Sequence, residues 1–192
     1  RQMCIRDRPS GAGLGGGSAD GAFALTLLNR HFELGISTKE LELIAAELGS
    51  DCPFFIRNVP SRVTGRGEHT TPINLDLAGW HIVLINPGVH INTAQAFGWV
   101  VPNEDRPGLD SWTGTGPTDW PGKLTNDFTG PVCEQHPVVR EAIQSLLKAG
   151  AVYAEMSGSG STVFGFFRDM PPAPWAAQLP ETWRHWAGQF PT

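Results

Sequence analysis

The chain has few cysteines and no long apolar run. Its 3 cysteines among 192 residues, Cys4, Cys52 and Cys133, are too few and too far apart for a disulfide framework or a C-x-x-C metal site. No window approaches the roughly 18 apolar residues of a membrane span, and residues 1–8 lack the apolar stretch of a secretory signal. We therefore expect reduced thiols, no membrane partner and a cytoplasmic protein.

A concentrated positive surface is also absent. The chain has 14 Lys and Arg residues against 19 Asp and Glu residues, a formal net charge of -5, and no basic cluster. Nucleic acids and anionic membranes attract proteins through a concentrated positive field. The composition therefore excludes a nucleic-acid partner and favours a small-molecule ligand. The length allows one large domain or two small ones, with enough apolar residues for a core.

Glycine is abundant and gathers in two segments, Gly11–Ser18 and Ser157–Thr162. The first leads into apolar residues 22–29, which predict a buried helix whose first turn lies near Ser18. Backbone amides of a glycine-rich turn at a helix N-terminus form an anion site, because no Cβ blocks close approach and the helix dipole adds positive charge. The first segment therefore predicts a phosphate site.

Three other interpretations of the first glycine segment remain open. The spacing of Gly11, Gly13 and Gly16 fits the dinucleotide fingerprint, but residues 6–9 do not form the buried strand that should precede it. A P-loop would need a lysine after the glycines, and none is there. A tight packing turn without a ligand is the third interpretation.

The remaining pattern predicts a mixture of helices and strands. Ser37 and Glu40 form a capping box for a helix that ends at Gly49, after which Pro53 holds Asp51 at a fixed corner. Before residue 125, the other predicted elements are a strand and turn over 63–72, a strand over 80–85, a short helix over 93–100 and a surface loop over 102–122. After it, they are a helix over 137–149, strands over 151–156 and 162–167 joined by the second glycine segment as a hairpin, a short helix over 175–179 and a strand over 183–190.

Four segments, in order, resemble the GHMP kinases: residues 9–20, 48–55, 124–128 and 156–165. The triple glycine followed by Ser18-Ala19-Asp20 is most similar to the branch whose substrate is a cytidine diphosphate-linked methylerythritol. The resemblance implies an α+β, two-domain GHMP-kinase fold. Residues 9–76 would be an incomplete N-terminal ATP-binding domain, a remnant like domain 2 of ribosomal protein S5, and residues 77–192 a ferredoxin-like α/β sandwich.

The same resemblance implies phosphoryl transfer from ATP to an alcohol, with Mg²⁺. Such a reaction needs the phosphates held and the hydroxyl proton accepted. Asp51 matches the family's aspartate at the acceptor hydroxyl, which implies a general base. Ser157, Gly158, Ser159, Gly160 and Ser161 would close on the phosphate site as a second loop, although an ordinary hairpin is the alternative. Ser18 would also contact Mg²⁺, and the implied ATP-binding residues are Pro9, Ser10, Gly11, Ala12, Gly13, Leu14, Gly15, Gly16, Gly17, Ser18 and Ala19.

Two further segments are less specific. Phe97 matches the position of an aromatic residue that stacks on cytosine in the family, and a helix residue facing the core is the alternative. Asn126 and Asp127 either bind a ligand or shape a turn, and their residue types favour the turn. The tryptophans are interpreted as packing residues.

The chain also departs from the family pattern. Members carry most of a domain before the first motif, including a strand with a lysine, so we expect residues 1–8 to be a non-native leader and the chain to be a truncated kinase, inactive alone. Without half of its first sheet, the chain should leave strand edges and apolar helix faces uncovered. The alternatives are a GHMP kinase of the homoserine or mevalonate type and a non-catalytic phosphate-binding half-kinase. The oligomeric state is not predicted.

Overall fold

The computed structural model describes residues 11–65, 67, 69–101, 108–109 and 114–191. The chain divides into two compact units, which are described separately below. Unit 1 holds Gly15–Asn74, and unit 2 holds Gly11–Leu14 together with the chain from Leu75 onward. The predicted leader over 1–8 and the predicted ATP contacts at Pro9 and Ser10 lie outside the described residues.

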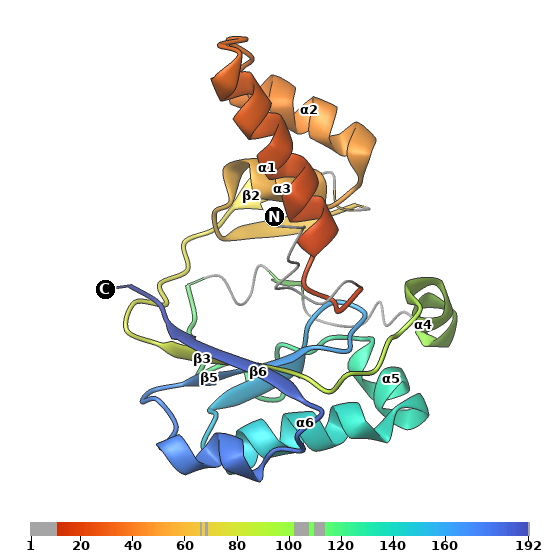
Figure 1. Cartoon of the computed structure of the whole chain (residues 1–192), viewed down its shortest axis with the longest axis vertical. Helices are drawn as coiled ribbons and strands as arrows, with labels where there is room; N and C mark the ends of the chain where they lie inside the picture. Colours follow the sequence, from red (N-terminus) through yellow and green to blue (C-terminus); the bar gives the residue numbers. More distant parts are fainter. Residues whose placement is uncertain (1–10, 66, 68, 102–107, 110–113, 192) are drawn as a thin grey trace, which may run out of the picture. The chain divides into compact units, whose positions relative to one another are not determined.

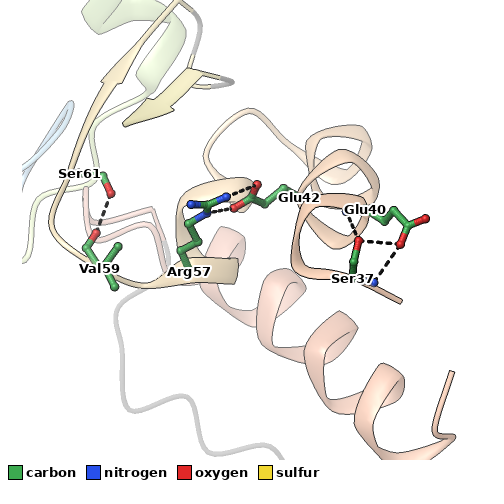
Figure 2. A network of polar contacts seen from close by, with 6 residues as sticks. All are labelled: Ser37, Glu40, Glu42, Arg57, Val59 and Ser61. Carbon is green, nitrogen blue, oxygen red and sulfur yellow. Dashed lines mark hydrogen bonds and ion pairs between the residues drawn. The ribbon is translucent and has the colours of Figure 1, made fainter. Parts of the chain in front are cut away.

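Unit 1 contains three helices and a two-stranded antiparallel sheet (Figure 1). The predicted capping box is confirmed: the Ser37 hydroxyl accepts from the Glu40 amide at 3.3 Å, and the Glu40 carboxylate accepts from the Ser37 amide at 2.9 Å (Figure 2). The hydrogen bonds from Ser37 lower the pKa of Glu40. The elements are α1 (Gly16–His31), α2 (Thr38–Leu48), α3 (Cys52–Arg57), β1 (Ser61–Thr64) and β2 (His69–Pro72).

Helix α3 was not predicted. Pro53 was interpreted as a stop, but it lies in the first turn of α3, where a missing N–H costs nothing. At the other end of α3, the Arg57 guanidinium holds the carboxylate of Glu42 on α2, with Nη2 donating to Oε2 at 3.2 Å and Nε donating to Oε1 (Figure 2). This ion pair links the helix that follows Asp51 to the helix that precedes it.

The prediction that α1 is buried is wrong. Only Ala19 and Ala22 of α1 are buried, whereas Phe23, Leu27 and Leu28 are 46%, 64% and 48% exposed. The reason is that α1 packs against α2 and α3, which cover one of its faces. Leu43 and Leu48 of α2 are exposed as well, so the expectation of uncovered apolar helix faces is confirmed for these helices.

Unit 2 is built on a four-stranded antiparallel sheet with the strand order β4-β5-β3-β6. Along the chain, helices lie between the first and second strands of this sheet and between its third and fourth strands. Together with the strand order, this is the ferredoxin-like arrangement that the resemblance implied. In this unit, helix α5 was not predicted, and the predicted short helix over 175–179 is a 3₁₀ helix. The elements are β3 (His81–Asn86), α4 (Thr93–Trp99), α5 (Thr129–Gln135), α6 (Pro137–Lys148), β4 (Tyr153–Met156), β5 (Val163–Phe167), η2 (Ala173–Gln178) and β6 (Arg184–Gln189).

Each face of this sheet has its own core. On one face, α6 and η2 lie along the sheet (Figure 1), and Val139 and Leu146 of α6 are fully buried against its strands. On the other face, Trp120 packs edge-on against Tyr153 and Phe166, with both ring pairs 5.4 Å apart. The segment around Trp120 therefore covers this face. The burial of Trp80, Trp120 and Trp183 agrees with the packing interpretation, whereas Trp186 is 56% exposed.

The structure also bears on the predictions from cysteine content and hydropathy. Cys52 and Cys133 are buried free thiols, while Cys4 lies outside the described residues. Within the part of the chain that the structure describes, no helix is both long enough and apolar enough to cross a membrane. Every strand pair among those residues is antiparallel, so they contain none of the parallel pairing that the dinucleotide interpretation required.

Candidate active site

The N-terminus of α1 presents backbone donors that have no partner within the helix. The first intrahelical bond runs from the Ala19 amide to the Gly15 carbonyl at 2.9 Å, so the amides of Gly16, Gly17 and Ser18 have no acceptor within the helix. Gly15, the N-cap residue, has φ 61° and no side chain to cap them. No described atom lies within 4 Å of where a Cβ would stand on Gly16 or Gly17. The helix start therefore has the donors, the dipole and the space for an anion.

Asp51 lies in the same unit as this helix start. It is exposed, it occupies the N-cap position of α3 without capping it, and the Ser50 hydroxyl donates to its Oδ1 at 3.5 Å. Two close approaches fix α3 against α1: a Cβ on Gly21 would stand 3.8 Å from Cys52 Sγ, and a Cβ on Gly15 would stand 2.8 Å from Phe55 Cζ. The packing of α3 thus ties Asp51 to the start of α1.

Gly67 is a further residue at this site, and the sequence analysis did not select it. Its φ is +120°, and a Cβ there would stand 2.7 Å from the Ser50 carbonyl oxygen and 3.1 Å from Asp51 Oδ1. Gly67 can therefore lie against the Ser50–Asp51 backbone only because it has no side chain. The available sequence signal was the pair of glycines, Gly65 and Gly67, in the predicted strand and turn.

In unit 2, the second glycine segment forms the predicted hairpin between β4 and β5. The Ser157 amide donates to the Thr162 carbonyl at 2.9 Å, and the Gly160 amide donates to the Ser157 carbonyl at 3.0 Å. Its hydroxyl groups have protein partners: Ser159 lies 3.2 Å from the Thr93 hydroxyl, and Ser161, which is fully buried, donates to the Val89 carbonyl. The Ser159 and Ser161 side chains therefore anchor the hairpin.

The structure brings residues Gly11–Leu14 onto this hairpin. Ser157 Oγ donates to the Gly13 carbonyl at 2.7 Å, and the Thr162 amide donates to the Ala12 carbonyl at 3.2 Å. A Cβ on Gly13 would stand only 2.1 Å from the Ser157 carbonyl oxygen. Gly11–Leu14 and the Ser157–Thr162 hairpin, far apart in the sequence, are therefore in direct contact within unit 2.

The turn and substrate candidates also lie in unit 2. Asn126 Oδ1 accepts from the Phe128 amide at 2.9 Å, so Asn126 shapes a turn as its residue type favoured. Phe97 on α4 is 65% exposed, and its ring meets that of Phe128 edge-on at 4.9 Å. The alternative in which Phe97 faces the core is therefore wrong, because most of its side chain is open to solvent.

The predicted site residues thus fall into two groups. Asp51 and Gly15–Ala19 belong to unit 1, whereas Gly11–Leu14, Phe97 and the Ser157–Ser161 loop belong to unit 2. Among the residues that the structure describes, no three His, Cys, Asp or Glu side chains come together in a way that could hold a metal ion. Ser18, the predicted Mg²⁺ contact, is half-buried in the first turn of α1.

Comparison with known proteins points to one family for both parts of the chain. Residues 4–58 match the model described as the GHMP kinases N terminal domain, and residues 115–185 match the model described as GHMP kinases C terminal. Together the two models match more than half of the chain.

Curated relatives at high identity carry one name, 4-diphosphocytidyl-2-C-methyl-D-erythritol kinase. The protein of that name from Bacteroides thetaiotaomicron is 46% identical over 174 residues, which are 91% of this chain and 61% of the relative. The one from Parabacteroides distasonis is 44% identical over 159 residues, covering 83% of this chain and 59% of the relative. The chain thus spans about three fifths of the length of these relatives.

Solved structures agree in fold. A crystal structure of 4-(cytidine 5'-diphospho)-2C-methyl-D-erythritol kinase matches with a TM-score of 0.79 and 29% identity, covering 95% of this chain and 68% of that one. A homoserine kinase from Cytophaga hutchinsonii matches with a TM-score of 0.55 and 15% identity over 96% of this chain and 68% of its own. The second likeness is one of fold alone.

Proposed function

The chain belongs to the GHMP kinase family, and we propose that the whole protein transfers the γ-phosphoryl group of ATP to the 2-hydroxyl of 4-diphosphocytidyl-2-C-methyl-D-erythritol. The names of the curated relatives at 44% to 46% identity support this substrate over homoserine or mevalonate, the substrates of the alternative kinases. The observation that carries the proposal is the packing of α3, which ties Asp51 to the open N-terminus of α1.

The residues at the start of α1 fit a nucleotide phosphate. Gly16, Gly17 and Ser18 supply backbone donors without intrahelical partners, the helix dipole adds about half a positive charge, and the missing side chains leave room for the anion. Gly11–Leu14 continue this segment as the rest of the proposed ATP loop. ATP would supply the phosphoryl group, and Mg²⁺ would neutralise the negative charge that develops on it. We propose that Ser18 is the protein contact of the metal.

Asp51 is proposed to accept the proton of the acceptor hydroxyl at a carboxylate oxygen. Its side chain is exposed, and the Ser50 hydroxyl donates to Oδ1 at 3.5 Å. The positioning of the acceptor oxygen contributes as much as basicity, because phosphoryl transfer depends mainly on in-line geometry. Gly67 supports this role by letting backbone, rather than a side chain, approach Asp51.

Phe97 is proposed to stack on the cytosine of the substrate. Its ring is largely exposed, and the perpendicular ring of Phe128 at 4.9 Å supports it. The proposed partner is therefore a small molecule, not a nucleic acid. A cytoplasmic location is part of the proposal, because ATP is the phosphoryl donor.

The test is an assay of the whole protein with ATP and each candidate alcohol, following ADP release. We expect turnover with the cytidine diphosphate-linked methylerythritol and none with homoserine or mevalonate. Asp51→Asn should lower kcat by about 100-fold or more and leave ATP binding nearly unchanged. The matched control is Asp76→Asn, since Asp76 is exposed in the same way and its Oδ1 accepts from the Ala78 amide at 2.9 Å.

The possible outcomes separate the alternatives. Rapid turnover of homoserine or mevalonate would replace the proposed substrate. Nucleotide binding without turnover of any alcohol would support a non-catalytic phosphate-binding protein. Full activity of Asp51→Asn would show that the base is another residue.

A further inference from the structure

Asn126 lies at the centre of a hydrogen-bond network beneath the hairpin loop of unit 2. Its side-chain amide Nδ2 donates to the Gly158 carbonyl at 2.7 Å and to the Met156 carbonyl at 2.9 Å. Its Oδ1 accepts from the Phe128 amide at 2.9 Å. Both amide protons are thus used on the two carbonyls that flank Ser157, so the side chain holds the loop from both sides of that residue.

The hairpin in turn holds the glycine segment. Ser157 Oγ donates to the Gly13 carbonyl at 2.7 Å, and the Thr162 amide donates to the Ala12 carbonyl at 3.2 Å. A continuous path of hydrogen bonds therefore runs from Asn126 through the hairpin to Gly11–Leu14, entirely within unit 2.

Glu155 supports the same network from β4. Its Oε1 accepts from the Met156 amide at 2.9 Å and from the Thr129 hydroxyl, and its Oε2 accepts from the Asn126 amide at 3.3 Å. The carboxylate thus fixes the backbone of Asn126, and the Asn126 side chain fixes the loop. To close the turn, Asn126 needs only the hydrogen bond that it accepts from the Phe128 amide. The two bonds that it donates to Met156 and Gly158 go beyond that turn.

We propose that Asn126 is a positioning residue for ATP, acting through Ser157 to hold Gly11–Leu14 in the conformation that binds nucleotide. The inference relies on the proposed function only for the identity of the ligand, ATP. None of these groups takes part in the reaction. The network restricts the backbone conformations of Gly11–Leu14, and ordering glycines in advance lowers the entropy cost of binding nucleotide. Gly13, with φ +77°, depends most on this external support.

Asn126→Asp tests the network selectively. The substitution keeps an acceptor for the Phe128 amide but replaces the two donors with an oxygen that faces the carbonyls of Met156 and Gly158. We expect amide hydrogen exchange at Thr162, which reports the bond to Ala12, to become about 10-fold faster, as for the loss of one net hydrogen bond. In the whole protein, the KM for ATP should rise about 10-fold, whereas the KM for the alcohol should change less than about twofold.

The matched control is Asn29→Asp. Asn29 lies in α1, and Ile36 lies in the loop between α1 and α2. Asn29 Nδ2 donates to the Ile36 carbonyl at 2.9 Å, and its Oδ1 accepts from the Ile36 amide at 3.0 Å. The same chemical change there should lower the free energy of unfolding without changing Thr162 exchange or the KM for ATP. A general loss of stability is thereby separated from a loss of positioning.

Ser157→Ala is the second variant, and it removes only the bond to Gly13. Because Asn126 is inferred to act through Ser157, the double variant should raise the KM for ATP no more than the more severe single variant does. If Asn126→Asp does not fold, Ser157→Ala alone tests the last step, by the same exchange and KM measurements.

Unchanged Thr162 exchange in Asn126→Asp would overturn the inference, as would faster exchange with an unchanged KM for ATP. Additive effects in the double variant would show that Asn126 acts by another route. If the wild-type protein binds no ATP, the proposed function fails, and the exchange measurement still decides whether Asn126 holds Gly11–Leu14.

Discussion

Substitution of Gly13 by alanine is the sharpest perturbation that the structure offers. A Cβ at this position would stand 2.1 Å from the Ser157 carbonyl oxygen and 3.0 Å from the Gly160 carbonyl oxygen. Both neighbours are backbone atoms of a hydrogen-bonded hairpin, which cannot rotate away as a side chain could. The glycine segment must therefore separate from the hairpin.

The cost can be estimated from the bonds that the separation breaks. The bonds from Ser157 Oγ to Gly13 and from the Thr162 amide to Ala12 are lost, at about 1 kcal/mol each. Because the substituted segment separates, the strain of a Cβ at the native φ of +77° is avoided, and only the two lost bonds count. Their loss, about 2 kcal/mol together, corresponds to a loss of ATP affinity of about 30-fold.

The assay is nucleotide binding to the whole protein, measured by titration calorimetry, with thermal unfolding alongside. Gly130→Ala is the control, because Gly130 lies in α5 without a positive φ and a Cβ there would meet no described atom within 4 Å. We expect Gly130→Ala to bind ATP normally and to be as stable as the wild type or slightly more so. ATP affinity of Gly13→Ala within a few-fold of the wild type would refute the role assigned to the contact between the two glycine segments.

Three further predictions concern other parts of the chain. Gly67→Ala should displace the Ser50–Asp51 backbone and lower kcat more than the KM for ATP changes, and equal effects on both would contradict the role of Gly67. Burial, with a smaller contribution from the negative charge of Glu155, raises the pKa of Tyr153, the chain's only tyrosine. The folded state therefore favours the protonated phenol. This contribution to the free energy of unfolding is complete below the ordinary tyrosine pKa of about 10 and is lost as the pH rises toward the folded value. The phenolate absorbance should therefore rise only together with alkaline unfolding, and a phenolate signal near pH 10 in a protein that circular dichroism shows to be folded would disprove this. The pKa of Glu40 is lowered, so its carboxylate stabilises the folded state fully above the ordinary Glu pKa of about 4.3, and this stabilisation is lost as the pH falls through the folded pKa. The difference in free energy of unfolding between the wild type and Glu40→Gln should therefore shrink in urea titrations at acid pH.

Local sequence was sufficient for features whose partners are neighbours in the chain. The capping box of Ser37 and Glu40, the hairpin around Ser157–Thr162 and the helix that begins at Pro137 depend on contacts within a few residues. The strand order of unit 2 followed from the family resemblance rather than from periodicity. Helix α3 was missed because Pro53 is as compatible with the first turn of a new helix as with a stop.

The sequence by itself predicted an anion site at the first glycine segment and determined that Asp51 follows a helix, because these expectations reside in residue type and spacing. Only the tertiary structure decided which groups those segments contact. The bond from Ser157 to Gly13, the approach of Gly67 to Asp51 and the exposure of Phe97 and Leu27 all depend on parts of the chain that are remote in sequence. Hydrogen bonds and burial are properties of pairs brought together by folding, and no single segment carries a signal for its distant partner.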